Sequence, residues 1–197
     1  DLAAADTLGG LVGKLGAGAQ LSNTYSLASV SATTFVGGLV GHVAASASTD
    51  NTSLATSYAA GSISGDPNTA GALVGGLSGD DTPMYQKLYF NEDLYPDALG
   101  QVQGDTSSEL INLTTSAMRD LTSYDTTTWD FSDLWSIKDP ETDKLSSYPY
   151  LTNSLLVKDQ LPGLVDNVAP ELVGLLPAFG SKGISVKPTL TVLLDEE

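Results

Sequence analysis

Histidine, serine and acidic side chains are the residues of this chain whose types could do chemistry. His42 is the only histidine and there is no cysteine, so a typical zinc site cannot be assembled. A serine nucleophile needs a base and a group that orients the base, and no Gly-x-Ser-x-Gly elbow surrounds any serine. We therefore predict that the chain is not an enzyme, and we interpret His42 as a solvent-facing corner residue.

Paired carboxylates are the second candidate for chemistry. They occur at Asp80-Asp81, at Asp139 and Asp143, and at residues 195–197. Glycan-cleaving enzymes need two carboxyl groups about 5 to 10 Å apart across a cleft. These acids fall in expected turns, at a chain end and in the closing segment rather than at repeated positions on one face. Solvated loops are the better interpretation, and a polysaccharide-processing β-helix is the least favoured function.

Oxygen ligands for a cation gather in sequence near the C-terminus. The run from Asp166 to Pro170 is similar to the calcium-binding linkers of tandem extracellular modules, and a carboxylate pair follows at Asp195 and Glu196. Asp166, Asn167, Asp195 and Glu196 are therefore the candidate calcium ligands, and calcium is the one cofactor that the sequence suggests. An ordinary polar turn before proline is the alternative.

Charge and hydropathy exclude several partners. The chain has 197 residues, with 8 Lys and Arg against 24 Asp and Glu and a formal net charge of −16. Such acidity repels nucleic acid and anionic membrane surfaces. No apolar run reaches the roughly 20 residues of a spanning helix, so we expect no membrane insertion. No secretory signal is recognisable at the start, and we expect any targeting signal to have been removed or to lie outside this segment.

A short phrase is repeated three times in the first third of the chain. It reads Gly-Gly-Leu-Val-Gly from Gly9 and from Gly37, and Gly-Ala-Leu-Val-Gly from Gly71. A repeat period of about 20 to 50 residues indicates stacked repeats. We predict a mainly β fold in which residues 1–90 form a short β-solenoid, because the glycines make a helix unfavourable.

Alternating strands follow two of these phrases. Residues 25–31 and 58–64 both start with Tyr, and in each we expect Val30 or Ile63 to face inward between outward serines. The third repeat departs after Gly75 and continues into an aromatic strand over residues 84–90. Residues 91–104 are expected to be loop.

A closing segment is predicted over residues 91–151. Apolar residues from Leu110 to Leu121 recur at helical spacing, so we predict a helix over residues 107–124 that closes the open end of the solenoid. The aromatic residues that follow are interpreted as core, with a sugar-stacking platform as the alternative: Trp129, Phe131, Trp135, Tyr148 and Tyr150. Sequons for N-glycosylation begin at Asn51 and Asn112.

These motifs resemble those of the GLUG-motif family over roughly residues 8–151. The repeated phrases match the motif, and the closing segment matches in order and spacing through residues 113–118, Trp129-Asp130-Phe131, Trp135 and residues 148–151. Ala72 replaces a glycine, and Leu88-Tyr89-Phe90 stands where many members have Cys-Tyr-Trp. The resemblance implies a repetitive, non-catalytic segment of a bacterial or archaeal adhesin or large secreted protein.

A second resemblance begins at Asp166. The Ala-Pro entry at Ala169, the turn at residues 177–180 and the Pro-Thr-Leu-Thr strand at residues 188–191 are similar to the first strands of a bacterial Ig-like domain. Such a sandwich takes around 100 residues. We therefore expect residues 152–168 to be a linker and residues 169–197 to be incomplete Ig-like strands.

The predicted function is that of a non-enzymatic structural or adhesive segment, extracellular or on the cell surface. Expected partners are other domains of a larger polypeptide or neighbouring copies of the chain, and a host or environmental glycan or protein is a further candidate. The alternative is a subunit of an extracellular filament joined by β-strand addition between chains, because the first coil and the Ig-like strands present unpaired edges.

Overall fold

The computed structural model describes residues 2–3, 7–44, 52–79, 83–100, 109–138, 145–153, 161–166, 171–176 and 191–195. Within these residues the protein is mainly β, as predicted, and most of its strands lie in parallel sheets. Short strands rich in glycine, serine and valine suit this arrangement, since small residues let neighbouring strands stack closely. None of the described helices is long and apolar enough to cross a lipid bilayer.

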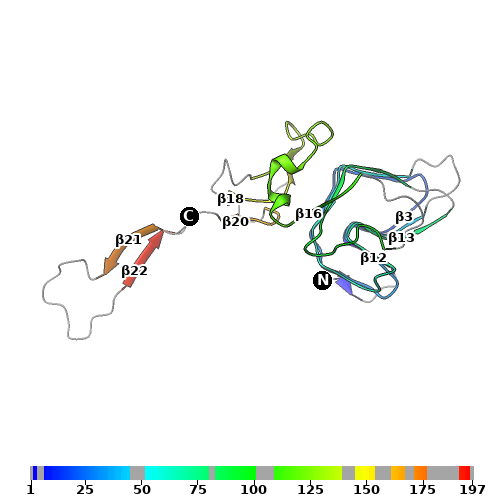
Figure 1. The fold of residues 1–197 in the computed structure, drawn as a ribbon, viewed down its shortest axis with the longest axis horizontal. Helices are drawn as coiled ribbons and strands as arrows, with labels where there is room; N and C mark the ends of the chain where they lie inside the picture. The colour runs from blue at the N-terminus through cyan, green and yellow to red at the C-terminus, as the bar shows by residue number, and fades with distance from the viewer. Residues whose placement is uncertain are drawn as a thin grey trace.

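The chain passes in the same order through the same sheet positions, and we call each pass a coil. Coil 1 covers residues 2–26, coil 2 residues 30–59 and coil 3 residues 63–91. Each of these coils gives one strand to each parallel sheet of the described chain. Figure 1 looks along the stack, so that strands of successive coils overlie one another.

The strands are grouped here by sheet. The five groups are β1 (Leu2–Ala3), β6 (Val30–Ser31) and β11 (Ile63–Ser64); β2 (Thr7–Gly9), β7 (Phe35–Gly37) and β12 (Ala70–Gly71); β3 (Val12–Leu15), β8 (Val40–Ala44) and β13 (Val74–Ser78); β4 (Gln20–Ser22), β9 (Ser53–Ala55) and β14 (Met84–Gln86); β5 (Tyr25–Ser26), β10 (Tyr58–Ala59), β15 (Leu88–Asn91) and β16 (Leu110–Leu113).

The register confirms the repeat alignment predicted from the sequence. Val12 pairs with Val40 and Val40 with Val74, which superimposes the three glycine phrases. Tyr25 pairs with Tyr58, as expected from the two alternating strands. Equivalent residues therefore lie above one another, and each coil is stabilised mainly by its neighbours.

A truncated fourth coil follows coil 3. Leu99 makes a parallel bridge to Val74, and β16 pairs along β15 with Leu88 opposite Leu110. The parallel arrangement thus continues to Leu113, past the predicted boundary at residue 90 and through part of the expected loop. The phrase Ala98-Leu99-Gly100 is a shortened copy of the repeat that the sequence analysis missed.

The interior of the stack is apolar. Four leucines have no exposed surface, two of them in strands and two at corners between strands: Leu54, Leu88, Leu39 and Leu73. Val30 is also buried while Ser29 and Ser31 are exposed, which confirms the predicted inward and outward pattern. Burial of each such side chain stabilises the fold by roughly 1.5–3 kcal/mol.

A corner with left-handed backbone separates the last two strands of each coil. Asn23, Thr56 and Lys87 occupy this corner with φ of 52°, 41° and 47°. The predicted strand over residues 84–90 is therefore wrong as a single element, because the corner at Lys87 divides it into β14 and β15. Asparagine tolerates this conformation, but a β-branched threonine is strained in it.

The predicted helix over residues 107–124 is also wrong. Residues 109–124 form β16 followed by two 3₁₀ turns, η1 (Ala117–Arg119) and η2 (Leu121–Ser123); residues 107–108 lie outside the described chain. The helical spacing of leucines misled the prediction because Leu110 and Leu113 are aligned by pairing with β15 instead. Pairing with an exposed strand edge overrides a weak helical propensity.

An aromatic segment, residues 114–153, lies beside the stack and not across its open end (Figure 1). It contains η1, η2 and the antiparallel pair β17 (Trp135–Ser136) and β19 (Tyr150–Leu151). Also within it, β18 (Leu145–Ser146) pairs antiparallel with β20 (Val165–Asp166), which follows the segment in the chain. The expectation that this segment closes the end of the stack is therefore corrected: it covers one side. We call it the aromatic flank.

The C-terminal strands form a hairpin. β21 (Glu171–Leu176) pairs antiparallel with β22 (Thr191–Asp195), with an irregular register between Leu172 and Gly174. In Figure 1 this hairpin is drawn in orange and red, away from the parallel sheets. Its assignment to an Ig-like domain stays a prediction.

Candidate functional site: the two edges of the stack and the aromatic flank

The N-terminal edge of the stack consists of the coil 1 strands, each outermost in its sheet. Val12, Leu21 and Tyr25 on this edge are only partly buried. Their partners in coil 2 have no more than a trace of exposed surface: Val40, Leu54 and Tyr58. Coil 1 therefore carries the apolar and aromatic residue types of an interior coil, although it lies at the exposed edge of the stack.

Charge and proline are nearly absent from the N-terminal edge. No acidic residue occurs between Asp6 and Asp50, and no proline precedes Pro67. Lys14 is the one lysine or arginine in the first fifty residues. Exposed strand edges are usually protected by charges, prolines or bulges. Residues 7–26 of this edge therefore contribute one positive and no negative side-chain charge to a chain of net charge −16.

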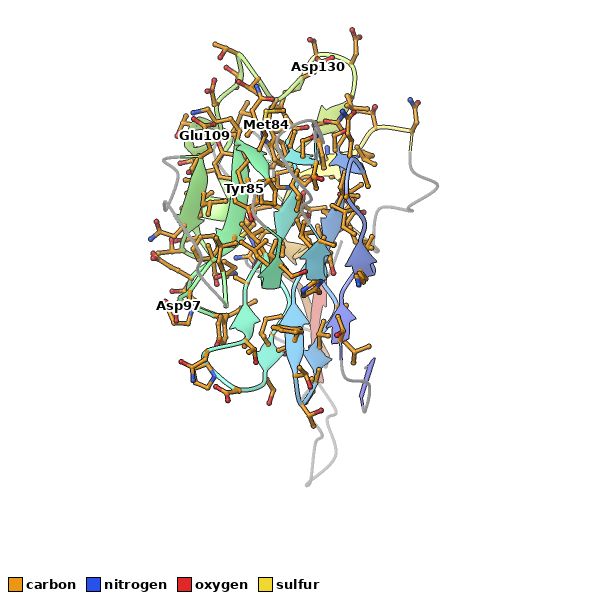
Figure 2. All side chains as sticks on the ribbon, turned by 90° about the vertical axis from the view of Figure 1, so that its right-hand side faces the viewer. Met84, Tyr85, Asp97, Glu109 and Asp130 are labelled. Carbon is orange, nitrogen blue, oxygen red and sulfur yellow. The ribbon has the colours of Figure 1, made fainter. Side chains whose placement is uncertain are left out.

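The C-terminal edge is protected by the truncated fourth coil. The backbone N–H of Ala72 donates to Asp97 O at 2.7 Å, and that of Leu73 donates to Ala98 O at 2.9 Å. Pro96 precedes this segment. Figure 2 shows Asp97 and Glu109 on this green side of the stack. The fourth coil therefore covers this edge at the corner from Ala72 to Val74 and along β15, whereas β11 and β14 remain outermost in their sheets.

An ion-pair cluster fixes the last corner. Lys87 Nζ lies 3.6 Å from Glu109 Oε1 and 3.5 Å from Asp125 Oδ2. The Lys87 N–H also donates to Glu109 Oε2 at 3.1 Å. One side chain thereby joins coil 3, the start of β16 and the aromatic flank.

The aromatic flank packs on the outward tyrosines of the parallel sheet. The rings of Tyr25 and Tyr58 stack with centroids 5.2 Å apart, and Trp135 lies 6.1 Å from Tyr25. Trp129 meets the ring of Tyr89 edge-on at 5.3 Å. The flank therefore contacts all three coils, and it continues onto Ile111 of the fourth.

Hydrogen bonds lock the flank to individual coils. Tyr58 Oη donates to Pro149 O at 2.7 Å and Trp129 Nε1 donates to Lys87 O at 3.1 Å. The Asp125 N–H donates to Tyr89 Oη at 2.9 Å. Burial raises the pKa of Tyr58 well above its usual range. Each bond satisfies a polar atom that burial would otherwise leave unpaired.

Burial confirms that the flank is core. Trp129 and Trp135 have no exposed surface and Tyr148 keeps 6%, while Phe131 and Tyr150 are partly buried. A sugar-stacking platform needs open ring faces, so this alternative is wrong for the two tryptophans. Arg119 covers the ring of Tyr148 with its guanidinium carbon 4.9 Å from the centroid.

Three aspartates cap turns of the flank. Asp120, Asp125 and Asp130 each accept a hydrogen bond from the backbone N–H and hydroxyl of the residue two positions later, in a repeated Asp-x-Ser/Thr pattern of five-residue spacing. Hydrogen bonds from the side chains of Thr127 and Ser132 lower the pKa of Asp125 and Asp130 respectively. The sequence analysis missed this pattern, although its spacing was readable.

His42 is buried, so its interpretation as a solvent-facing residue was wrong. The Phe35 ring lies 5.0 Å from the imidazole and also fills the space over Gly76, where an added Cβ would be 2.3 Å from the ring. Burial, followed by the nearby charge of Lys14, lowers the pKa of His42. The error arose because the cover comes from a different strand of the coil.

The side chains of the candidate calcium ligands lie outside the described part of the chain. Asp166 ends β20 opposite Leu145, and Asp195 ends β22 opposite Glu171. Asn167 and Glu196 lie outside the described residues. The part of the chain with described side chains holds no cluster of three or more potential metal ligands. The calcium linker stays a prediction.

Of the other acidic pairs and the two glycosylation sequons, the structure describes only the sequon at Asn112. Asp80, Asp81, Asp139, Asp143 and the sequon at Asn51 lie outside the described residues. Asn112 is exposed on β16, where its Nδ2 donates to a carboxylate oxygen of Glu92. The site is therefore accessible at the protected edge.

Comparisons with protein-family models, with curated proteins and with solved structures give no match for this chain. Its function is accordingly argued from the two edges and the flank.

Proposed function

We propose that this chain is a β-solenoid segment of the GLUG-motif type, with a non-enzymatic structural or adhesive role in an extracellular or cell-surface protein. The observation that carries the proposal is the register: equivalent residues of three successive coils pair one above another in every parallel sheet of the described chain. Quasi-one-dimensional stacks of this kind extend and stiffen a polypeptide.

The use of the described acids supports a structural role. Asp66 accepts from the Asn68 N–H at 2.9 Å, and Asp93 accepts from the Thr115 N–H at 2.7 Å. Three further aspartates cap the turns of the flank, as described above. These carboxylates hold their own loops in place, which is the behaviour expected of a framework.

The flank supports the same role mechanically. Its bonds to Tyr58, Lys87 and Tyr89 tie coils together from the side. A stack held only by nearest-neighbour contacts can peel from either end. A segment that contacts several coils at once opposes peeling, which suits a protein that bears load or projects a binding domain.

Labelling of intact source cells tests the location. An antibody against the chain should bind cells whose envelope is unbroken, or the chain should be found in the medium. Binding that appears only after permeabilisation would overturn the extracellular role. Incubation of the purified chain with a panel of polysaccharides tests the non-enzymatic role, and reproducible release of reducing ends would overturn that part.

A further inference from the structure

One glycine of coil 1 has no steric reason to be glycine within this chain. The equivalent positions of the repeat are Gly13, Gly41, Gly75 and Gly100. A Cβ on Gly13 would meet only Thr7 O, at an ordinary contact distance of 3.6 Å, and Gly13 is not in the left-handed backbone region.

The other three glycines are required by the coil on their N-terminal side. A Cβ on Gly41 would lie 2.6 Å from Leu8 C and O, and a Cβ on Gly75 would lie 2.5 Å from Val36 N. At Gly100 the nearest atom would be Gly75 O, at 2.4 Å. These contacts are too short for any real Cβ. Each glycine therefore marks a place where the preceding coil presses closely.

The N-terminal edge carries two further signs of an absent neighbour. Val12, Leu21 and Tyr25 have the side chains of buried positions but are partly exposed. Residues 7–26 of this edge also contain no acidic residue and no proline, whereas Pro96, Asp97 and Glu109 lie at the C-terminal edge. One more coil on this edge could pack on coil 1 in the same way as coil 1 packs on coil 2.

From the space at Gly13 and this continuity we propose that the N-terminal edge is a docking surface for one further coil of the same repeat, parallel to coil 1 and supplied by the same polypeptide. The coil would place the backbone of its second strand against Gly13, as Leu8 lies against Gly41. The inference rests on the proposed stacked structural role, but its test reads stability and not cellular location, so the two can fail separately.

The test adds the missing neighbour to the full chain. A copy of residues 30–62 replaces Asp1, so that it leads into Leu2 as residue 62 leads into Ile63; Leu2 and Ile63 both pair with Val30. We expect the melting temperature to rise by about 5 °C or more, since each added repeat brings a new interface. Amides of Val12–Leu15 should also exchange more slowly than in the original chain.

The substitution Gly13→Ala then tests whether the added coil packs on the N-terminal edge at Gly13. In the original chain we expect the melting temperature to stay within about 2 °C or to rise, because Gly→Ala reduces the entropy of the unfolded chain. In the extended chain the same substitution should lower the melting temperature by about 5 °C or more, and we expect the same loss from Gly41→Ala in the original chain, where an added Cβ would lie 2.6 Å from Leu8 C. The comparison of Gly13→Ala between the two chains stands even if Gly41→Ala fails to fold.

Three results would overturn the proposal. One is an added coil that neither raises the melting temperature nor slows exchange at Val12–Leu15. Another is an equal effect of Gly13→Ala in both chains. The third is a dimer of the original chain, seen by analytical ultracentrifugation, that Gly13→Ala converts to a monomer; the occupant would then be a second copy.

Discussion

The two edges of one parallel stack differ in how far further chain covers them and in the charge they carry. At the C-terminal edge the segment at residues 97–100 and β16 pair with coil 3, and Asp97 and Glu109 add negative charge. At the N-terminal edge the strands of coil 1 are outermost and residues 7–49 contain no acid. The sheets are the same on both sides, so the difference lies in what covers them.

This difference shows that the stack of repeats ends differently at its two ends. The C-terminal end has a shortened repeat at residues 97–100 and a preceding proline, Pro96. The N-terminal end has the composition of an interior coil. An edge with interior composition is expected to have a neighbour, since monomeric β proteins protect their exposed edges.

Loss of Trp129 should have the largest effect, because it removes a fully buried side chain of the aromatic flank. Trp129 has no exposed surface and bonds Lys87 O, so Trp129→Ala is expected to cost about 3–5 kcal/mol. Urea unfolding followed by circular dichroism measures it. Met84→Ala, at a side chain 60% exposed, is the control and should cost less than about 0.5 kcal/mol. Similar costs for the two variants would break the comparison.

Matched leucines compare the edge with the interior. Leu54 has no exposed surface and pairs with Leu21 on one side and Tyr85 on the other. Leu54→Ala should cost about 2–5 kcal/mol of unfolding free energy, and Leu21→Ala less than about half of that, because Leu21 lacks one neighbour. Equal costs in urea unfolding would mean that the N-terminal edge is not open.

The left-handed corner gives a smaller effect. Thr56 has φ 41° and its hydroxyl donates to Asn23 Oδ1 at 2.6 Å. Thr56→Asn should raise stability by about 0.5–1 kcal/mol, because asparagine adopts this backbone more easily. Asn23→Thr is the matched reverse change at the edge and should lower stability by a similar amount. Thermal unfolding measures both, and destabilisation by Thr56→Asn would contradict the strain at this corner.

Acid is expected to have the smallest effect, and to destabilise the aromatic flank before it destabilises coils 1 and 2. Hydrogen bonds lower the pKa of Asp125 and Asp130 below the usual value. Their contribution to stability is therefore complete above the unfolded-state pKa of about 3.9 and is lost as the pH falls through the lower folded-state pKa. Residues 7–49 contain no acid, so this part of the titration should not reach them.

Tryptophan fluorescence follows the flank, since both tryptophans lie in it, and circular dichroism follows the strands. Below about pH 4 the fluorescence should change before the dichroism does. Asp130→Asn should bring the two transitions closer together. Fluorescence that never precedes dichroism in the original chain would contradict a separate flank.

The parts of the fold that the sequence predicted are those in which the same residue type recurs. Val12, Val40 and Val74 pair in the expected alignment, and so do Tyr25 and Tyr58. A recurring phrase of glycine and valine indicates a structural unit that is repeated and stacked, with a corner at the glycines and a strand at the valine. The mainly β, parallel class followed from that repetition.

The remaining parts depended on contacts that a linear pattern does not contain. Leu110 and Leu113 have helical spacing, but pairing with β15 determines their conformation. His42 is covered by Phe35 from another strand. The segment Ala98-Leu99-Gly100 is too short to be recognised as a repeat, yet its backbone completes the hydrogen bonds of Ala72 and Leu73. The candidate calcium ligands were chosen by local similarity alone, and their side chains lie outside the described part of the chain.

Amide hydrogen exchange of the original chain tests the central claim, that the N-terminal edge of the stack is open while the fourth coil covers the C-terminal edge at Val74 and along β15. The three equivalent strands Val12–Leu15, Val40–Ala44 and Val74–Ser78 provide matched peptides. We predict that, after correction for intrinsic rates, amides of Val12–Leu15 exchange at least about tenfold faster than those of the other two strands. Equal protection of all three strands, or fastest exchange in Val74–Ser78, would contradict this account.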